Sequence, residues 1–246
     1  MNLDEHPLGA AARPRFFVVS GPGGTGKSTV IRRWLQADPE LGYVRNYTTR
    51  QRRPADPVSG IDDADWFHFV SVAEFRQRIE EGFFAQWANA AKGYASGTPL
   101  APLEEAIASV QDLVFDYTPQ LYLNLRRRFR EQTVGIFMVP PSLAELRRRL
   151  AGRGDSEEQI DLKERMAIQD LAYMDEHDYL VVNHEVERAL ATLAAIKSAE
   201  KARIAALDGL DDTYGQLPPP SMLFYYDPHD QRLDHVHSEG GEGAAP

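Results

Sequence analysis

Cysteine and long apolar runs are both missing from this sequence, and each absence excludes a class of protein. Without cysteine, the chain cannot form a disulfide framework, use a catalytic thiol or bind zinc through thiolates. No segment approaches the roughly 20 consecutive apolar residues of a membrane-spanning helix. Residues 1–15 also lack the basic and then apolar order of a secretory signal. We therefore expect a cytoplasmic protein that does not engage a membrane.

Positive charge is scarce as well, since 27 Lys and Arg residues are outnumbered by 37 Asp and Glu residues. The imbalance is strongest after residue 206, where Arg232 is the only lysine or arginine. A net charge of −10 is unfavourable for a duplex nucleic-acid surface, because such a surface must neutralise phosphates. The arginines before residue 206 nevertheless come in clusters, which predicts local sites for anions.

The organisation of the chain changes along its length. Residues 15–205 alternate strand-like and helix-like segments, which indicates one α/β domain around a parallel sheet. Residues 1–14 are predicted to be a flexible leader. Residues 206–246 are interrupted by Pro and Gly and are predicted to be an acidic tail, in which only the apolar stretch 222–227 is expected to dock.

The expected secondary structure follows from apolar runs and helix-capping residues. Ser71 and Ser142 are each followed three residues later by Glu, as in a capping box, and Thr118 precedes a proline as an N-cap does. Strands are predicted at residues 16–20, 44–47, 66–70, 83–87, 113–115, 134–139 and 179–182.

The strongest single motif follows the first predicted strand. Residues 21–28, GPGGTGKS, fit the pattern G-x-x-x-x-G-K-[ST] without a mismatch. Its glycines let successive main-chain N–H groups turn inward around a phosphate, and the next helix adds the positive end of its dipole. Lys27 is expected to reach the β- and γ-phosphates, and Ser28 to bind Mg²⁺. The motif predicts a polyphosphate site and leaves open a kinase, a nucleotide-driven switch or an ATP hydrolase.

A basic loop at residues 48–53 is the second candidate feature. Arg50 and Arg53 stand three residues apart, so their guanidinium groups can hold one phosphate from two sides. The alternative interpretation is a solvated basic loop without a ligand.

Two weaker features complete the set. Asp116 ends an apolar strand, where P-loop proteins place a carboxylate near Mg²⁺, although an ordinary strand end is an equal alternative. Arg147, Arg148, Arg149 and Arg153 surround a predicted helix end. Such arginines either stabilise the charge of a transferring phosphoryl group or form the wet face of an amphipathic helix.

Taken in order, these segments resemble the guanylate kinases over about residues 15–200. The resemblance implies a P-loop NTPase fold with a central parallel sheet, an inserted acceptor-binding lobe at about 44–99 and a mobile helical lid at about 140–168. The matching pieces are GPGGTGKS, YTTRQRRP, FHFVSVAEFRQRIEEGFFAQW, YASGTP, the strand ending in Asp116, VPPSLAELRRRLAGRG, the ERM around Arg165, and DYLVVN ending at Asn183.

The resemblance also implies a role for individual residues. Those expected to bind ATP are Gly21, Gly23, Gly24, Thr25, Gly26, Lys27, Ser28, Thr29 and Asn183. Those expected to act in catalysis are Lys27 and the lid residues Arg149, Arg153 and Arg165. Those expected to bind the phosphoryl acceptor are Asn46, Arg50, Arg53, Phe67, Gln86, Tyr94, Thr98, Asp116 and Thr118. Mg²⁺ is the implied cofactor, with Ser28 and Asp116 as its ligands.

The match fails in the acceptor pocket. Phe67 and Asn46 replace a tyrosine and a serine of the family, while Gln86 and Thr118 replace the two carboxylates that read guanine. Guanine presents N–H donors, and ionised carboxylates only accept hydrogen bonds. Losing two charge-assisted bonds is therefore expected to weaken guanine recognition by orders of magnitude. The alternative is that a carboxylate arrives from the acidic cluster at residues 62–65.

We therefore predict an ATP-dependent phosphotransferase whose acceptor is a phosphorylated small molecule other than GMP, either a nucleoside monophosphate or a sugar phosphate. The first alternative is a genuine GMP kinase with a remodelled pocket. The second is a non-catalytic binding module, against which the intact P-loop with Lys27 argues. ATP and the acceptor are the expected partners, and the sequence leaves the oligomeric state open.

Overall fold

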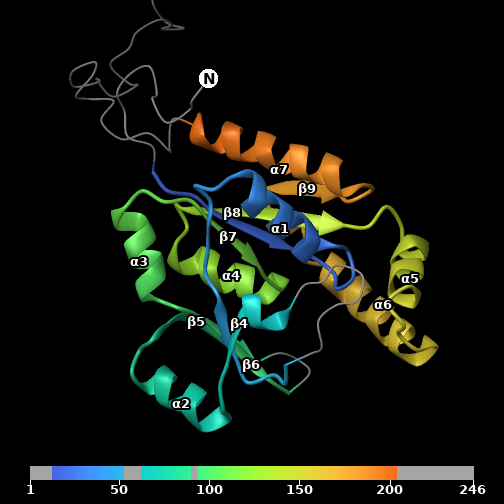
Figure 1. Cartoon of the computed structure of the whole chain (residues 1–246), viewed down its shortest axis with the longest axis horizontal. Helices are drawn as coiled ribbons and strands as arrows, with labels where there is room; N and C mark the ends of the chain where they lie inside the picture. The colour runs from blue at the N-terminus through green and yellow to red at the C-terminus, as the bar shows by residue number, and fades with distance from the viewer. Residues whose placement is uncertain (1–12, 53–61, 90–92, 204–246) are drawn as a thin grey trace, which may run out of the picture.

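The computed structural model describes residues 13–52, 62–89 and 93–203, which form two β-sheets and the helices around them (Figure 1). The larger sheet has five strands in the order β2-β7-β1-β8-β9, and all of its strand pairs are parallel. The smaller sheet has four strands in the order β4-β3-β6-β5. A parallel sheet with helices on both faces confirms the predicted α/β P-loop fold.

The larger sheet is built from short apolar strands. At its centre, β1 (Phe16–Ser20) lies between β7 (Leu113–Asp116) and β8 (Thr133–Val139). Its two edges are β2 (Gly42–Tyr43) and β9 (Tyr179–Val182). Every residue of β1 is buried, as expected for a central parallel strand covered on both faces.

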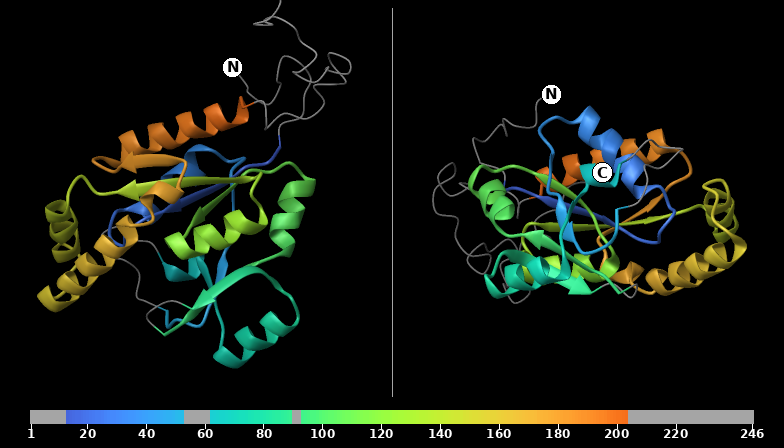
Figure 2. Two further views of the ribbon diagram at one scale, coloured as in Figure 1. Left: turned by 180° about the vertical axis from the view of Figure 1, so that it is seen from behind. Right: turned by 60° about the horizontal axis from the view of Figure 1, so that its bottom comes forward.

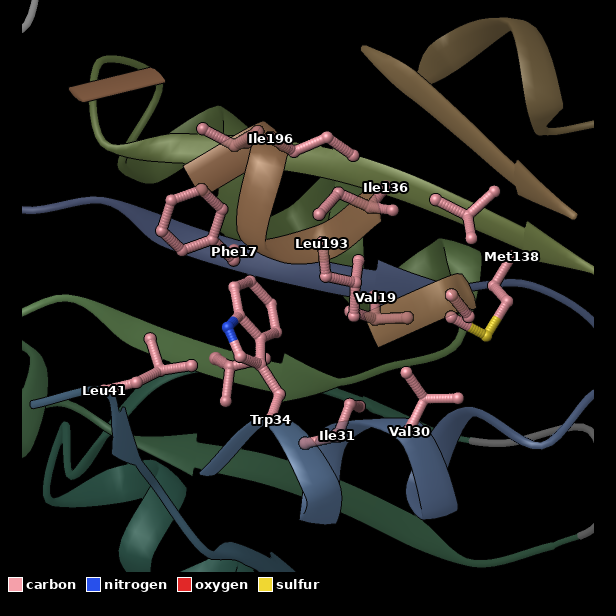
Figure 3. Close-up of a cluster of buried hydrophobic side chains, with 14 of the residues drawn as sticks. Phe17, Val19, Val30, Ile31, Trp34, Leu41, Ile136, Met138, Leu193 and Ile196 are labelled. Atoms are coloured by element: carbon pink, nitrogen blue, oxygen red, sulfur yellow. The ribbon is translucent and has the colours of Figure 1, made fainter. Parts of the chain in front are cut away.

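Alternation along β1 sends successive side chains into two separate cores. Phe17 and Val19 pack with α1 (Lys27–Ala37) and α7 (Val186–Lys201) on one face. Figure 3 shows this core, where Trp34 of α1 lies 5.5 Å from Phe17 between ring centroids. The odd and even positions of one strand therefore anchor both helical layers.

The other face of the sheet is covered by α3 (Ala101–Ala108) and α4 (Pro119–Arg128). Phe16 and Val18 of β1 are completely buried in this second core. Thr118 is the N-cap of α4, with Pro119 at its first position, as the sequence predicts.

The smaller sheet and one helix form a lobe over residues 46–99, which lies below α4 in Figure 1. Arg128 at the end of α4 donates hydrogen bonds to the carbonyl oxygens of Phe84 and Ala85, which fixes the lobe to the main domain. The lobe consists of β3 (Asn46–Thr48), a 3₁₀ turn (Asp63–Asp65), β4 (Phe67–Phe69), α2 (Val72–Glu80), β5 (Phe84–Asn89) and β6 (Ala95–Pro99).

Helices α5 (Leu143–Ala151) and α6 (Glu157–Leu171) form an arm that extends to one side of the larger sheet (Figures 1 and 2). The arm has its own small core, which includes Leu146 and Leu150. Arg147 joins the two helices by ion pairs to three carboxylates of α6 and its N-terminal turn, namely Glu157, Asp161 and Glu164. A 3₁₀ turn (Met174–Glu176) then leads back to β9.

One corner of the molecule joins the start of β1 to the end of α7. The main-chain N–H of Arg15 donates to Asp112 Oδ1 at 2.7 Å, and the Lys201 ammonium lies 3.1 Å from Asp112 Oδ2. Asp112 itself is 5% exposed. A single carboxylate just before β7 thus connects both ends of the described domain.

Most predicted strands and caps are present, with three differences. Of the predicted strand at 44–47 only residues 46 and 47 form one, because β2 ends at Tyr43 and β3 begins at Asn46. The strand β6 was not predicted. Ser71 forms the expected capping box, whereas Ser142 caps α5 without the reciprocal bond from Glu145. The predicted tail lies outside the described residues, as does the predicted leader apart from residues 13 and 14. No helix in the described part of the chain is long and apolar enough to cross a membrane.

Candidate active site

The loop after β1 takes the conformation that its glycines allow. Gly21 has a φ of 129°, and a Cβ there would lie 2.3 Å from the carbonyl oxygen of Met138 in β8. Gly26, the residue before α1, has a φ of 90°, and a Cβ there would lie 2.6 Å from Asn183 Nδ2. Both positions therefore require glycine for backbone conformation and for space.

Lys27 folds back over this loop. Its ammonium donates to the carbonyl oxygens of Gly21 at 2.8 Å and Pro22 at 2.9 Å. Burial lowers the pKa of Lys27 from its ordinary value, against the opposing charge of Asp116. The amine is thus held by main-chain dipoles at the mouth of the P-loop, where a phosphate group would offer it stronger acceptors.

Ser28 and Asp116 meet as their positions in the motifs predict. The Ser28 hydroxyl donates to Asp116 Oδ2 at 2.6 Å. Ser28 lies in the first turn of α1, and Asp116 ends β7, whose carboxyl end adjoins that of β1. Because parallel strands end at the same edge of a sheet, the two oxygens come together at the rim of the P-loop.

The arm contributes Arg149 to the same loop. Its guanidinium donates to the carbonyl oxygens of Thr25 at 3.2 Å and Asn183 at 2.8 Å, and to Glu145 at 2.8 Å. The Asn183 side chain also donates to the carbonyl oxygen of Thr25, at 2.7 Å. Hydrogen bonds from Arg148 and Arg149 lower the pKa of Glu145 to about 2. Three residues expected near ATP are therefore in direct contact.

The other two predicted lid arginines are less involved. Arg153 follows α5 and lies close enough to Lys27 for its charge to lower the pKa of that amine. Arg165 is exposed on α6, and in the described part of the chain it makes no hydrogen bond to the P-loop. Their predicted catalytic role therefore depends on a movement of the arm, which stays a prediction.

Arg50 lies at the edge of the lobe. Its guanidinium pairs with Asp63 at 2.7 Å, and its central carbon is 5.0 Å from the Phe67 ring centroid and 5.8 Å from that of Phe69. The side chain is 11% exposed, so the aromatic rings and the carboxylate hold it in one position. Its predicted companion, Arg53, lies outside the described residues.

Three polar side chains of the lobe and one from the residue after β7 form a buried cluster. Gln86 Nε2 donates to Thr98 Oγ1 at 3.0 Å, and Thr98 Oγ1 donates to Asn46 Oδ1 at 2.8 Å. The Tyr117 hydroxyl also bonds to Thr98 Oγ1, and burial raises the pKa of Tyr117 well above its ordinary value. We call Asn46, Gln86, Thr98 and Tyr117 the amide cluster. All four are at most 7% exposed.

Tyr117 was not predicted as a site residue. The sequence does contain a signal for it. Tyr117 stands two residues after the buried Phe115, so by the alternation along a strand its side chain is expected on the same side of the sheet, and it carries a hydroxyl group there. What the sequence does not show is that this alternation turns the Tyr117 side chain toward the lobe rather than toward the P-loop.

Two other predicted acceptor residues lie elsewhere. Tyr94 lines a hollow with Phe75 and Trp87 on the α2 side of the lobe, where the structure gives it no contact with the amide cluster. The Thr118 hydroxyl accepts from the main-chain N–H of Leu121 as the N-cap of α4. Tyr94 lies there because it directly precedes β6, which starts at Ala95. Thr118 lies where it does because it is the N-cap of α4.

The acidic cluster considered as a source of a missing carboxylate is engaged by arginines instead. Asp63 pairs with Arg50, and Asp62 pairs with Arg52 at 2.5 Å. Asp62 also accepts from the main-chain N–H of Ala64. Neither carboxylate bonds to Gln86 in the described structure.

A histidine outside the predicted site contacts the end of β1. The Ser20 hydroxyl lies 2.5 Å from His177 Nε2, and His177 Nδ1 lies 2.8 Å from the carbonyl oxygen of Tyr173. Because a carbonyl oxygen only accepts, Nδ1 carries the proton and Nε2 accepts from Ser20. The imidazole stacks on Tyr122 at 4.0 Å, and burial lowers its pKa. His177 thus connects the segment after the arm to the strand that enters the P-loop.

Comparison with known proteins shows which family has this architecture. The sequence profile described as guanylate kinase matches residues 13–200. The chain belongs to the guanylate kinase family. A guanylate kinase of Zymomonas mobilis is 36% identical over 212 residues, covering 85% of this chain and 95% of the relative. A guanylate kinase of Novosphingobium aromaticivorans is 37% identical over 201 residues, covering 81% and 88%.

A solved structure shares the fold. The guanylate kinase of Anaplasma phagocytophilum superimposes with a TM-score of 0.69 and 22% identity, covering 85% of this chain and all of the other. As a member of the guanylate kinase family, the chain is an ATP-dependent phosphotransferase of the nucleoside-monophosphate-kinase type. The expectation of an acceptor other than GMP is wrong. The two relatives described above cover 85% and 81% of this chain, and both are named guanylate kinase.

Proposed function

We propose that this chain is a guanylate kinase, which transfers the γ-phosphoryl group of ATP to GMP and so forms ADP and GDP. One structural observation supports this most strongly. Asp116 bonds to Ser28 of the P-loop, and the next residue, Tyr117, bonds to Thr98 of the lobe. The last residue of β7 and the residue after it therefore join the P-loop to the lobe, so a donor and an acceptor held on either side would meet at the end of this strand.

The two halves of the site would then have separate tasks. The lobe at residues 44–99 would take GMP, with Arg50 and Arg53 on its phosphate. The P-loop would hold the phosphates of ATP, and Lys27 would exchange its main-chain carbonyl partners for the β- and γ-phosphates. The arm at residues 140–168 would act as the lid, bringing Arg153 toward the transferring group.

Mg²⁺ fits the residues at the rim of the P-loop. A serine hydroxyl and a carboxylate in contact supply oxygen ligands, which are the ligands that this ion prefers. Ser28 and Asp116 would hold it, and it would supply neutralisation of phosphate charge. The chain's own residues do the positioning, and no general base is required because the nucleophile is already a phosphate oxygen.

Steady-state kinetics of the purified protein test the proposal. With ATP and Mg²⁺, ADP release should depend on GMP, with AMP, CMP and UMP giving far lower kcat/KM. The Lys27→Met variant serves as the control for contaminating kinases. An ADP release that no nucleoside monophosphate stimulates would contradict the proposal.

A further inference from the structure

The amide cluster contains a buried acceptor without a partner. Among the described residues, four buried side-chain atoms make no hydrogen bond, and three of them lie elsewhere, namely Arg15 Nε, Thr25 Oγ1 and Asn183 Oδ1. The fourth is Gln86 Oε1, on a side chain that is 7% exposed. A buried polar atom without a hydrogen bond is unfavourable and rare in folded proteins, so its presence indicates a ligand that completes it.

The hydrogen bonds around Thr98 fix which atom of Gln86 is left over. Thr98 Oγ1 has one proton, which it donates to Asn46 Oδ1, and its lone pairs accept from Tyr117 and from Gln86. With Asn46 Oδ1 accepting the Thr98 proton, the Gln86 amide presents its NH₂ to Thr98. The carbonyl oxygen is the atom without a partner, and the site requires a hydrogen-bond donor from its ligand.

The unpartnered oxygen carries no charge, and the described carboxylates considered as substitutes for one are engaged by other residues. Asp116 accepts from Ser28, and Asp63 and Asp62 pair with Arg50 and Arg52. The Thr118 hydroxyl caps α4. A ligand that reaches the amide cluster thus meets one neutral acceptor rather than two anionic ones.

The chemistry of purine bases determines what one neutral acceptor can distinguish. Hypoxanthine and guanine both carry an N1–H donor, whereas N1 of adenine is an acceptor that repels a carbonyl oxygen. The 2-amino group, which separates guanine from hypoxanthine, needs a second acceptor before it adds affinity. A single carbonyl oxygen therefore separates the 6-oxopurines from adenine and separates the two 6-oxopurines weakly.

We propose that Gln86 makes this chain a kinase for 6-oxopurine nucleoside monophosphates as a class, phosphorylating IMP nearly as well as GMP and rejecting AMP. The inference rests on the proposed GMP kinase activity. It adds a specificity-determining residue and a second substrate. The orientation of the Gln86 amide, imposed by Thr98, decides between acceptance of an N1–H donor and acceptance of adenine.

The test is the ratio of kcat/KM for GMP to that for IMP in the native protein and in two variants of Gln86. In the native protein the ratio should lie within about tenfold, because neither substrate makes a bond that the other lacks. Gln86→Glu should raise it by about tenfold or more, since an anionic oxygen in place of the carbonyl oxygen attracts the 2-amino donor of guanine as well as N1–H. Gln86→Met should lower both values by about tenfold and leave the ratio unchanged.

Folding of each variant is checked by Tm and by affinity for a non-hydrolysable ATP analogue. A native ratio above about 100-fold, or a ratio that Gln86→Glu leaves unchanged, would overturn the inference while GMP kinase activity stands. Efficient use of AMP would overturn it by showing that Gln86 presents its NH₂ to the base. The absence of turnover with every monophosphate would instead remove the proposed function, and the inference with it.

Discussion

The P-loop and the lobe face the same strand end but satisfy their polar atoms in different ways. Around the P-loop, Lys27, Arg149 and Asn183 all bond to main-chain carbonyl oxygens. In the lobe, Gln86 and Thr98 bond to other side chains and leave one oxygen over. Cationic side chains and main-chain groups would bind the phosphates, and such groups bind phosphate in many different ligands. The base would instead contact single side-chain atoms, whose donor or acceptor character selects it.

The largest effect should come from the P-loop side. Lys27→Met removes the amine that would move onto the ATP phosphates, and kcat should fall by about 10³-fold. Affinity for GMP, measured by calorimetry without ATP, should stay nearly unchanged. Lys197→Met is the matched control, because this lysine pairs with Asp38 far from the loop. Equal losses in the two variants would mean that Lys27 acts through stability alone.

The second largest effect is expected in the lobe. Arg50→Ala should lower kcat/KM for GMP by about 10²-fold, since a buried bidentate donor to phosphate is removed. Affinity for an ATP analogue should stay within about twofold. Arg52→Ala, which removes an exposed ion pair with Asp62, should cost little. If Arg50→Ala also abolishes ATP binding, the division between the two halves is wrong.

A moderate effect on stability should distinguish the amide cluster from its neighbours. Thr98→Val deletes the hydroxyl shared by three buried partners and should lower the free energy of unfolding by about 1–3 kcal/mol. The Tm should fall by about 5 °C, with a further loss of selectivity between GMP and AMP. Ser96→Ala, two residues earlier on β6, should change Tm much less. Equal changes of Tm in Thr98→Val and Ser96→Ala would show that the hydrogen bonds of the amide cluster add no stability beyond ordinary packing.

The smallest effect is a dependence of stability on pH, and it comes from His177, which contacts Ser20 before the P-loop. Since burial lowers the pKa of His177, the unfolded state takes up a proton below about pH 6.5 that the folded state refuses. Stability should therefore fall as pH falls through that range. His177→Gln should flatten this dependence of Tm, whereas Ser20→Ala should lower Tm at every pH and keep the slope. A pH slope that survives in His177→Gln would assign it to other groups.

The same contrast explains how much the sequence could predict. The P-loop, the Ser28–Asp116 contact and the strands β1 and β9 were predicted because they depend on local backbone geometry and on parallel strands sharing an edge. In β6 the order Ala-Ser-Gly-Thr-Pro has little strand propensity of its own. It becomes a strand because β3 and β5 pair with it from both sides.

The acceptor could not be predicted for a related reason. In the sequence, Gln86 is a neutral residue where the guanylate kinases have a glutamate. This difference predicts an acceptor other than GMP, and that prediction is wrong. Among the described residues its carbonyl oxygen has no hydrogen-bond partner, because Thr98 bonds to Asn46 and Tyr117. These partners come from three separate strands or strand ends, so their arrangement depends on tertiary packing that no local pattern encodes.

The corner formed by Asp112 has a practical consequence for handling this protein. Asp112 joins the start of β1 to the end of α7, whereas the P-loop follows the opposite end of β1. The start of β1 and the end of α7 therefore lie at one corner of the domain, on the side away from the P-loop (Figure 1). A fluorophore, affinity tag or fused domain attached through either end should leave turnover undisturbed, and the pair forms a natural junction for inserting the domain into another chain.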